Sequence, residues 1–439
     1  MTILLPQENE VVNLLKQFRR EKHEILQVYY KNYQASISKN RNYSQIKQLV
    51  TPSDNIFMIH LESYNAEFSN EKISPNLINI AKTQGIFFPR IQASAVLTIR
   101  SQEVLLCGIL PSLGQNLSKG NTLTRDLRCI PKILKENGYK TMYFKSHSNL
   151  EFANTANFMK NIGFDEIHSK DIMKSTDREL SWGYPEDIFY ARVFEYLKKH
   201  QQEKIFAYIA VSSTNHFPFY NDEKKIAFPQ FANLIPYPNP ITTREKIADT
   251  TYIQDNFFGK MFTELFKPTF GNNSHLVVYG DHSWPIEIHP GNKFNENEAY
   301  QENFVSSFGI VPATSKSKQF AMGKVVSNLY SHLDIPLTIL DLAGIHGYQL
   351  SGHSFFNELT TNSTEITRNS HCLVSVQPFA DKYIATVQYP IKLIYNTTKN
   401  TVTEYNIQED PHEKKSTEEH IIKEGDIISL QNCLQENNT

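Results

Sequence analysis

The pattern of apolar and polar positions changes between two periods along most of this chain. Short runs of β-branched and aromatic residues predict buried strands, and apolar residues at helical spacing predict helices between them. The predicted strands cover 55–63, 86–94, 204–214 and 274–280, and the predicted helices cover 73–85, 98–110, 187–202 and 251–267. A further helix, glycine turn and strand follow one another within 129–146.

Strands that alternate with helices are typical of βαβ units, which build a mostly parallel sheet with helices on both faces. The sequence therefore predicts an α/β fold. Residues 372–407 differ, because short β runs there are broken by Asp, Pro and Asn, and we expect a small antiparallel subdomain. The predicted organisation is an N-terminal helical segment and linker (1–50), a large α/β domain (51–365) and a C-terminal β-rich subdomain with a tail (366–439).

Residues 10–36 place apolar side chains at helical spacing among many charges, which predicts one long amphipathic helix. Residues 36–55 are polar and are expected to form a linker. Packing of the helix against the large domain is the favoured interpretation. Attachment to a membrane surface is the alternative, because Lys and Arg accompany Leu, Val and Tyr in this segment.

The composition narrows the class of protein. The chain has 439 residues, of which 40% are hydrophobic and 21% charged, and its formal net charge is −2. These values are typical of a soluble globular protein, and the lack of a basic surplus argues against nucleic acid as a partner. No run of about 18 apolar residues occurs, so no membrane-spanning segment is expected. The N-terminus lacks signal-peptide features, which makes the cytoplasm the expected location and the membrane periphery the alternative.

Four cysteines are scattered along the chain without a C-x-x-C pair: Cys107, Cys129, Cys372 and Cys433. This spacing is not that of a disulfide framework or a thiolate metal site. We therefore expect buried free thiols, which fit a reducing compartment.

Three predicted strands end in polar residues with metal-binding or catalytic potential. Glu62 follows the first, Asn215 and His216 follow the third, and Asp281 and His282 follow the fourth. Each alone could simply end a strand and begin a turn. The carboxyl ends of parallel strands share one sheet edge, however, so these groups can converge. Glu, Asp and His form an oxygen and nitrogen ligand set that suits Mn²⁺ or Zn²⁺.

Thr98 lies where a predicted strand and short loop give way to a helix. It could be an ordinary N-cap. Alternatively, the helix N-terminus favours a phosphate or an alkoxide there, and a bound metal would lower the pKa of the hydroxyl and make it a nucleophile. Ser101 is the nearest competing hydroxyl. Arg100 could add positive charge to the site or belong to a solvated helix face.

Four motifs in this order resemble the lipoteichoic acid synthase and phosphoglycerol transferase branch of the sulfatase/alkaline phosphatase superfamily. They are IHLESYN, LTIRSQEVLLCGILPS, STNHFPF and VVYGDHSWP. Similarity to the superfamily's C-terminal signatures extends the resemblance to about residues 50–420. It implies an alkaline phosphatase-like sheet and one divalent metal, typically Mn²⁺ with Zn²⁺ or Mg²⁺ as alternatives, held by Glu62, Thr98, Asp281 and His282.

The resemblance also implies a substrate phosphate contact at His216, beside Asn215. Branch members carry a Trp-Asn-Arg trio between the nucleophile and this histidine, whereas this chain has Ala153, Asn154 and Thr155 in the corresponding stretch. His147 and Asn149 are candidates for that wall of the site instead.

Two differences between this sequence and the superfamily limit which of the superfamily's properties we expect here. Sulfatases need C/S-x-P-x-R around their modified nucleophile, and Cys129-Ile130-Pro131-Lys132-Ile133 lacks the arginine, which argues against sulfate-ester chemistry through this motif. Known synthases of this branch carry transmembrane helices before the catalytic domain, and this sequence shows none.

The expected activity is metal-dependent phosphoryl transfer from a phosphodiester through phosphorylated Thr98. The resemblance implies a glycerophospholipid or glycerophosphoryl donor and a sugar or polyol acceptor. A phosphodiesterase or phosphatase with the same site, using water as acceptor, is the alternative. A non-catalytic binding protein is disfavoured, because the set of Glu62, Thr98, Asp281 and His282 is intact.

Overall fold

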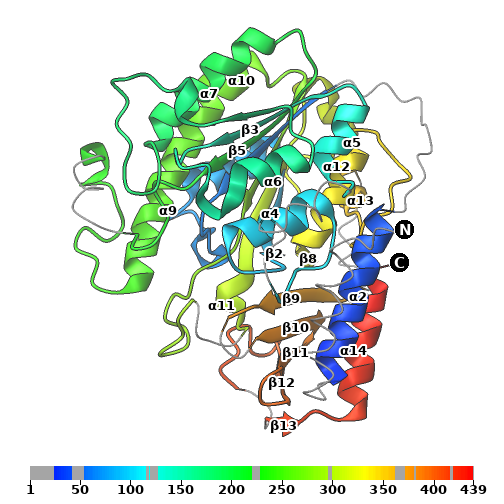
Figure 1. The fold of residues 1–439 in the computed structure, drawn as a ribbon. Helices are drawn as coiled ribbons and strands as arrows, with labels where there is room; N and C mark the ends of the chain where they lie inside the picture. The colour runs from blue at the N-terminus through cyan, green and yellow to red at the C-terminus, as the bar shows by residue number, and fades with distance from the viewer. Residues whose placement is uncertain are drawn as a thin grey trace.

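Two β-sheets of unequal size organise the chain, and the smaller sheet lies beyond one end of the larger one (Figure 1). The computed structural model describes residues 24–41, 54–114, 118, 127–219, 228–294, 299–360, 371–379, 382–415 and 419–438. The predicted α/β fold with a small C-terminal antiparallel subdomain is confirmed.

The large sheet has eight strands in the order β4-β3-β5-β1-β6-β7-β2-β8. Every neighbouring pair is parallel except the two pairs that include β7, so β7 alone runs against the others. The strands are β1 (Asn55–Leu61), β2 (Ile86–Gln92), β3 (Lys140–Lys145), β4 (Glu166–His168), β5 (Ile205–Val211), β6 (Ser274–Gly280), β7 (Val305–Val311) and β8 (Tyr330–Ser331).

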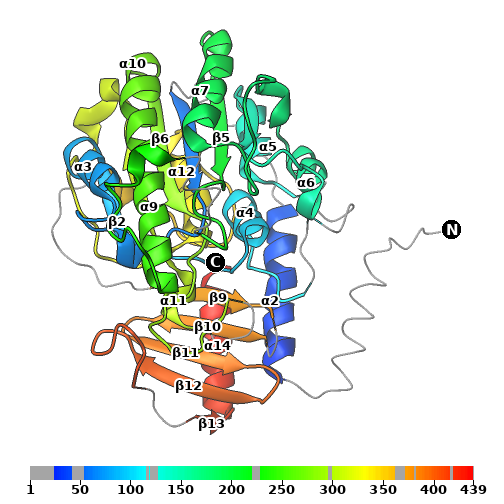
Figure 2. The same ribbon diagram turned by 90° about the vertical axis from the view of Figure 1, so that its left-hand side faces the viewer.

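Helices cover both faces of this sheet. One face packs on α3 (Pro75–Gln84), α7 (Glu186–Leu197) and α9 (Thr243–Lys260), which continues into a π-helical turn, η7 (Met261–Phe266), and α10 (Lys267–Thr269). The other face packs on α4 (Thr98–Cys107), α5 (Ile130–Glu136), α6 (Thr155–Asn161), α12 (Ile335–Leu342) and α13 (Phe356–Thr360). Figure 2 shows the two helical layers on either side of the strands.

The burial of the central strand, β1, explains why its sequence is a nearly continuous apolar run. Every residue of β1 is buried, because helices cover both faces of the sheet. Phe57 and Ile59 pack into one core, whereas Ile56 and Met58 pack into the other. This alternation fixes which side chains follow the strand into the loop at its carboxyl end.

The small sheet is antiparallel, in the order β13-β12-β11-β10-β9. Its strands are β9 (Leu373–Gln377), β10 (Tyr383–Gln388), β11 (Ile391–Asn396), β12 (Thr401–Asn406) and β13 (His420–Ile421). One face packs on the C-terminal helix α14 (Glu424–Glu436), and the other packs near α11 (Gln301–Phe304).

The N-terminal helix α2 (Glu24–Arg41) lies along α14 (Figure 1). Its buried side chains, including Ile25, Leu26 and Tyr29, share an apolar cluster with residues of the small sheet and α14. In the described part of this helix, these apolar residues are therefore not available to a membrane surface. Residues 10–23 of the predicted helix lie outside the described part of the chain.

The expected linker over 36–55 is wrong for its first six residues, which continue the helix to Arg41. Ser36 donates a hydrogen bond to the Tyr33 carbonyl and accepts one from the Leu110 N–H. Asn40 donates to the Cys107 carbonyl at 2.7 Å. These polar side chains were mistaken for linker residues because their partners are distant in sequence.

Among the residues that the structure describes, no helix combines the length and the apolar character needed to cross a bilayer.

We predict that truncating the α2–α14 contact destabilises the protein. Leu430 is fully buried in the cluster shared by α2, α14 and the small sheet. Leu430→Ala should lower the free energy of unfolding by about 2–5 kcal/mol, because it leaves a cavity in a packed core. Ile428 lies on the same helix and is 52% exposed, so Ile428→Ala is the matched control. Equal denaturation midpoints for the two variants in urea would contradict this prediction.

Candidate active site

The carboxyl ends of three neighbouring parallel strands bring the predicted ligands together. β1 lies between β5 and β6, and Leu61 is in register with Val211 on one side and Gly280 on the other. Glu62 and Asp281 therefore leave the sheet side by side. Gly280 is required at this point, because a Cβ atom there would lie 2.7 Å from the Cβ of Tyr64.

Glu62, Asp281 and His282 form a buried group at this edge, with exposed fractions of 3%, 0% and 2%. His282 Nε2 lies 3.3 Å from Asp281 Oδ2 and 3.7 Å from Glu62 Oε1. His282 Nδ1 donates to the Ser283 carbonyl at 2.9 Å, which leaves the lone pair of Nε2 facing the two carboxylates. This arrangement is typical of a metal-ligating histidine.

His60 is a member of this group that the sequence analysis missed. It lies in β1 two residues before Glu62, and its Nε2 is 3.1 Å from Asp281 Oδ2. Both atoms are buried, and neither forms a hydrogen bond of good geometry with a described residue. The ligand atoms of His60, Glu62 and Asp281 all lie within 4.8 Å of one another, which fits a shared divalent cation. The spacing His-x-Glu in a buried strand was the available signal, since residues i and i+2 share one face.

Charge around Asp281 favours its ionised form. Burial alone would raise the pKa of this carboxyl, but the nearby His282 and His60 rings and the Ser63 N–H hold the pKa well below its usual range. An ionised carboxylate is the state that binds a metal.

Thr98 is the first residue of α4, after Leu97, whose φ is +81°. Its Oγ1 donates a hydrogen bond to Glu62 Oε2 at 3.3 Å, which places the hydroxyl beside the carboxylate group. The structure thus brings Thr98 together with Glu62, Asp281 and His282. No side chain of the described residues caps the N-terminus of α4, which favours an anion at its first N–H groups.

Ser101, the competing hydroxyl, is fully buried and hydrogen-bonded to His332 Nδ1 at 3.1 Å. It does not line the cavity beside Thr98.

Thr98 opens into a cavity of about 390 Å³. This volume is within the range of small-molecule sites. The residues that line it come from the ends of several strands and the loops after them: His60, Glu62, Leu97, Thr98, Ile99, Gln102, Tyr143, Lys145, His147, Phe152, Ala153, Thr155, Trp182, Ala210, Val211, Ser212 and His216.

His216 and Trp182 form an aromatic part of the cavity lining. The two rings stack with centroids 3.6 Å apart, and His216 Nδ1 donates to the Phe217 carbonyl at 3.0 Å. The other ring nitrogen of His216, Nε2, takes no part in this hydrogen bond. His147 also lines the cavity, 5.7 Å between ring centroids from Trp182.

Lys145 and Trp182 are cavity residues that sequence reasoning missed. Lys145 ends β3, a parallel strand next to β5, so its position at a strand end was the available signal. Its Nζ donates to Thr155 Oγ1 at 3.1 Å. Burial lowers the pKa of Lys145 to about 8, opposed by the nearby Glu62. The amine is therefore mostly protonated at neutral pH. Trp182 lies in a loop with no pattern that marks it.

Three other predicted residues point elsewhere. Asn215 is fully buried and donates to the carbonyls of Glu62 and Ser63, at 2.9 and 3.2 Å, so it positions the Glu62 loop. Arg100 donates to the carbonyls of Ser112 and Gly114, away from the cavity. Asn149 accepts hydrogen bonds from the Glu151 and Phe152 N–H groups in an exposed turn.

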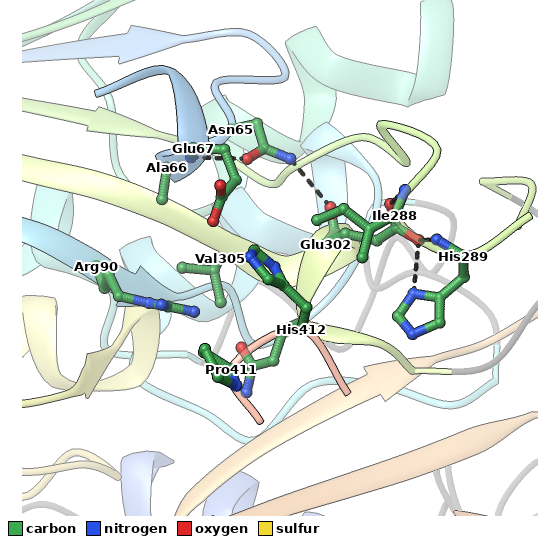
Figure 3. A pocket seen from close by; sticks show the side chains of 11 residues that line it. Asn65, Ala66, Glu67, Arg90, Ile288, His289, Glu302, Val305, Pro411 and His412 are labelled. Atoms are coloured by element: carbon green, nitrogen blue, oxygen red, sulfur yellow. Dashed lines mark hydrogen bonds and ion pairs between the residues drawn. The ribbon is translucent and has the colours of Figure 1, made fainter. Parts of the chain in front are cut away.

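A buried carboxylate, that of Glu302, holds the loop that follows His282. Glu302 accepts hydrogen bonds from the N–H groups of Ile286, Ile288 and His289, and from the His289 ring at 2.9 Å. Asn65 donates to the carbonyls of Trp284 and Glu302, as Figure 3 shows for the latter. The cavity drawn there has room for a single water, at about 20 Å³, so this region supports the site and does not receive a substrate.

The cysteines contradict the expectation of free thiols. Cys107 pairs with Cys129 and Cys372 pairs with Cys433, and none of the four is free. Sequence reasoning failed because both pairs join segments that only the fold brings together. Disulfides are typical of oxidising compartments, so the argument for a reducing compartment no longer holds. The buried, disulfide-bonded Cys129 is also unavailable as a nucleophile.

Residues 54–345 match the Sulfatase family model, which covers well over half of the chain. The chain belongs to the Sulfatase family. Among curated proteins it is 24% identical, over 354 residues, to the lipoteichoic acid synthase of Staphylococcus aureus (strain USA300). The aligned part is 73% of this chain and 52% of that protein, so the chain spans about half the length of the curated relatives it matches.

Solved structures share the fold. A protein in the alkaline phosphatase superfamily from Vibrio parahaemolyticus superposes with a TM-score of 0.68 at 17% identity, covering 93% of this chain and 95% of that one. The lipoteichoic acid synthase LtaP from Listeria monocytogenes gives a TM-score of 0.68 at 16% identity, with coverages of 92% and 96%. The expected alkaline phosphatase-like architecture is thereby confirmed.

We predict that Ser63 supports metal binding without being a ligand. Ser63 Oγ donates to Glu62 Oε1 at 2.9 Å, and such partners orient ligating carboxylates. Ser63→Ala should weaken Mn²⁺ binding by about 10–100-fold, measured by calorimetric titration. Ser69 lies in the same loop but hydrogen-bonds to Tyr64 and Ser307, so Ser69→Ala is the control. Unchanged affinity in Ser63→Ala would show that this hydrogen bond does not matter.

Proposed function

We propose that this protein is a metal-dependent phosphoryl-group transferase that acts on a phosphodiester through phosphorylated Thr98. The observation that carries this proposal is the Thr98 hydroxyl, hydrogen-bonded to Glu62 at 3.3 Å and open to a cavity. Its similarity to proteins named lipoteichoic acid synthase supports the same class of reaction.

A divalent cation held by Glu62, Thr98, Asp281 and His282 would, when bound, neutralise negative charge on the phosphoryl group and favour the ionised hydroxyl. We favour Mn²⁺, with Zn²⁺ or Mg²⁺ as alternatives, because the donor set is oxygen and one imidazole nitrogen. The close grouping of the His60, Glu62 and Asp281 ligand atoms, all within 4.8 Å of one another, supports a cation at this position.

The reaction proceeds in two displacements at phosphorus. In the first, Thr98 Oγ1 bonds to phosphorus as the ester bond to the donor alcohol breaks, and the alcohol leaves with the proton that Thr98 gives up. In the second, an acceptor hydroxyl bonds to phosphorus as the Thr98 ester breaks, and the proton of the acceptor returns to Thr98. Glu62 orients Oγ1 for the first displacement through its hydrogen bond.

Side chains across the cavity stabilise the charge that develops on the phosphoryl oxygens. His216 donates a hydrogen bond to one of them, and Lys145, mostly protonated at neutral pH, adds a positive charge. The N–H groups at the start of α4 lie on the Thr98 side. Trp182 and Phe152 supply apolar surface for the group that the phosphate carries.

The proposed donor is a glycerophospholipid or another glycerophosphoryl ester, and the proposed acceptor is a hydroxyl of a sugar or polyol. Water in the second displacement would make the protein a phosphodiesterase or phosphatase. The two outcomes differ in product alone, because the residues that act on phosphorus are the same.

We predict that Thr98→Ala abolishes turnover while the protein still folds. Loss of the oxygen removes the bond to phosphorus, whereas loss of a residue near a helix start typically costs only about 1 kcal/mol. Thr98→Ser should retain measurable activity. The assay uses glycerophosphoryl esters with Mn²⁺, and mass spectrometry of the protein should find the phosphoryl adduct on Thr98.

Ser101→Ala is the matched control, because this hydroxyl lies on the same helix and faces His332. An adduct on Ser101, or an active Thr98→Ala protein, would disprove the mechanism. A product in which the phosphoryl group is bonded to a polyol indicates a transferase. Transfer of the phosphoryl group to water indicates a hydrolase.

We predict that His216→Ala lowers turnover by about 10²-fold, the effect of one lost transition-state hydrogen bond. Metal content should stay normal, since His216 is not a member of the group of side chains that could hold the metal. Asn149→Ala, in the exposed turn outside the cavity, should leave turnover within about twofold and serves as the control. Loss of metal together with activity in His216→Ala would make His216 a metal ligand instead.

A further inference from the structure

A second group of metal-binding side chains lies outside the candidate active site. Asp334, His353 and His371 each offer one ligand atom, and these atoms all lie within 4.8 Å of one another. None of the three lines the cavity at Thr98. Asp334 precedes α12, His353 follows that helix, and His371 lies two residues before β9 of the small sheet.

The distances fit a small divalent ion. His371 Nε2 lies 3.4 Å from Asp334 Oδ2, and two ligand atoms of a tetrahedral zinc ion are about 3.4 Å apart. The His353 and His371 rings are neighbours, with centroids 4.7 Å apart. The backbone N–H of His353 donates to Asp334 Oδ1 at 2.8 Å, which fixes the His353 segment against this carboxylate.

One ring nitrogen of His353 has no hydrogen-bond partner. This atom, Nδ1, is buried, and no described residue makes a hydrogen bond with it. A single carboxylate beside two imidazoles can pair with one of them as an ion pair, and Asp334 does so with His371. That pair leaves the position of the His353 ring unexplained, whereas a cation shared by all three residues accounts for it.

A second acidic group is close by. The Glu436 carboxylate, near the end of α14, acts electrostatically on both imidazoles and accepts the Cys372 N–H at 3.2 Å. The His353 residue is partly exposed, so an ion can enter from solvent and water can complete its shell.

We propose that Asp334, His353 and His371 form a second divalent-metal site, suited to Zn²⁺, that joins the large α/β sheet domain to the small sheet. Two imidazoles and a carboxylate are a common zinc ligand set. The ligands come from both parts of the fold, and His371 adjoins the Cys372–Cys433 disulfide. The bound ion therefore pins the start of β9 to the start of α12. This site does not depend on the chemistry proposed at Thr98.

The test measures zinc per chain by elemental mass spectrometry after chelation and reloading. A background variant, Glu62→Gln with Asp281→Asn, removes the candidate active-site metal. We expect one zinc ion in this background and none after His371→Ala is added. Zinc should raise the melting temperature of the background variant but not of the His371→Ala variant.

The matched control is His346→Ala in the same background. His346 pairs with Asp341 at 2.8 Å without a second imidazole, so its loss should leave zinc binding unchanged. His353→Ala, whose ring is partly exposed, provides a second variant if His371→Ala fails to fold. Binding of Co²⁺ should give the visible absorption of a low-symmetry nitrogen and oxygen site. If the background variant binds no zinc, or binds it equally after either cluster histidine is removed, the group is an ion pair only and the proposal is wrong.

Discussion

Parallel pairing of β1 with β5 on one side and β6 on the other is the constraint on which the candidate site depends. Each strand delivers its carboxyl-end residues to the same edge, and loop contacts then fix them there. The Ser63 N–H donates to Asp281 Oδ1 at 2.9 Å, and Asn215 donates to the Glu62 carbonyl at 2.9 Å. A one-residue slip of β1 would turn Glu62 to the opposite face and separate it from Asp281.

Local patterns predicted most of the fold and the residues at strand ends, because period and burial are properties of a single segment. Residues whose role depends on distant partners were not predicted. Arg100 was predicted to add charge to the site or to lie on a solvated helix face, yet its guanidinium is buried and donates to carbonyls of the loop after α4. Trp182 and Lys145 act through stacking and burial that only the assembled cavity creates. The disulfides were not predicted for the same reason, since 22 and 61 residues separate the paired cysteines.

The cavity combines an aromatic wall with a nearby cation, and the two come from different parts of the chain. Trp182 enters from the loop before α7 and stacks on His216, whereas Lys145 lies at the end of β3. A lysine is a compact point charge without the planar fork of arginine, so this cation attracts an anion without fixing its orientation through two parallel hydrogen bonds.

The helix that carries Thr98 is held at both ends by parts of the chain outside the matched family region. Ahead of Thr98, the Val376 N–H on β9 donates to the Ser94 carbonyl at 2.9 Å, and Ala95 bridges to the same strand. This contact braces the loop that contains Leu97, whose positive φ is costly for a residue with a branched side chain. At the other end, Asn40 of α2 holds the Cys107 carbonyl, and Cys107 is bonded to Cys129. The small sheet and α2 are therefore part of the structure that places the Thr98 hydroxyl, and a change in either can alter the site without contacting it.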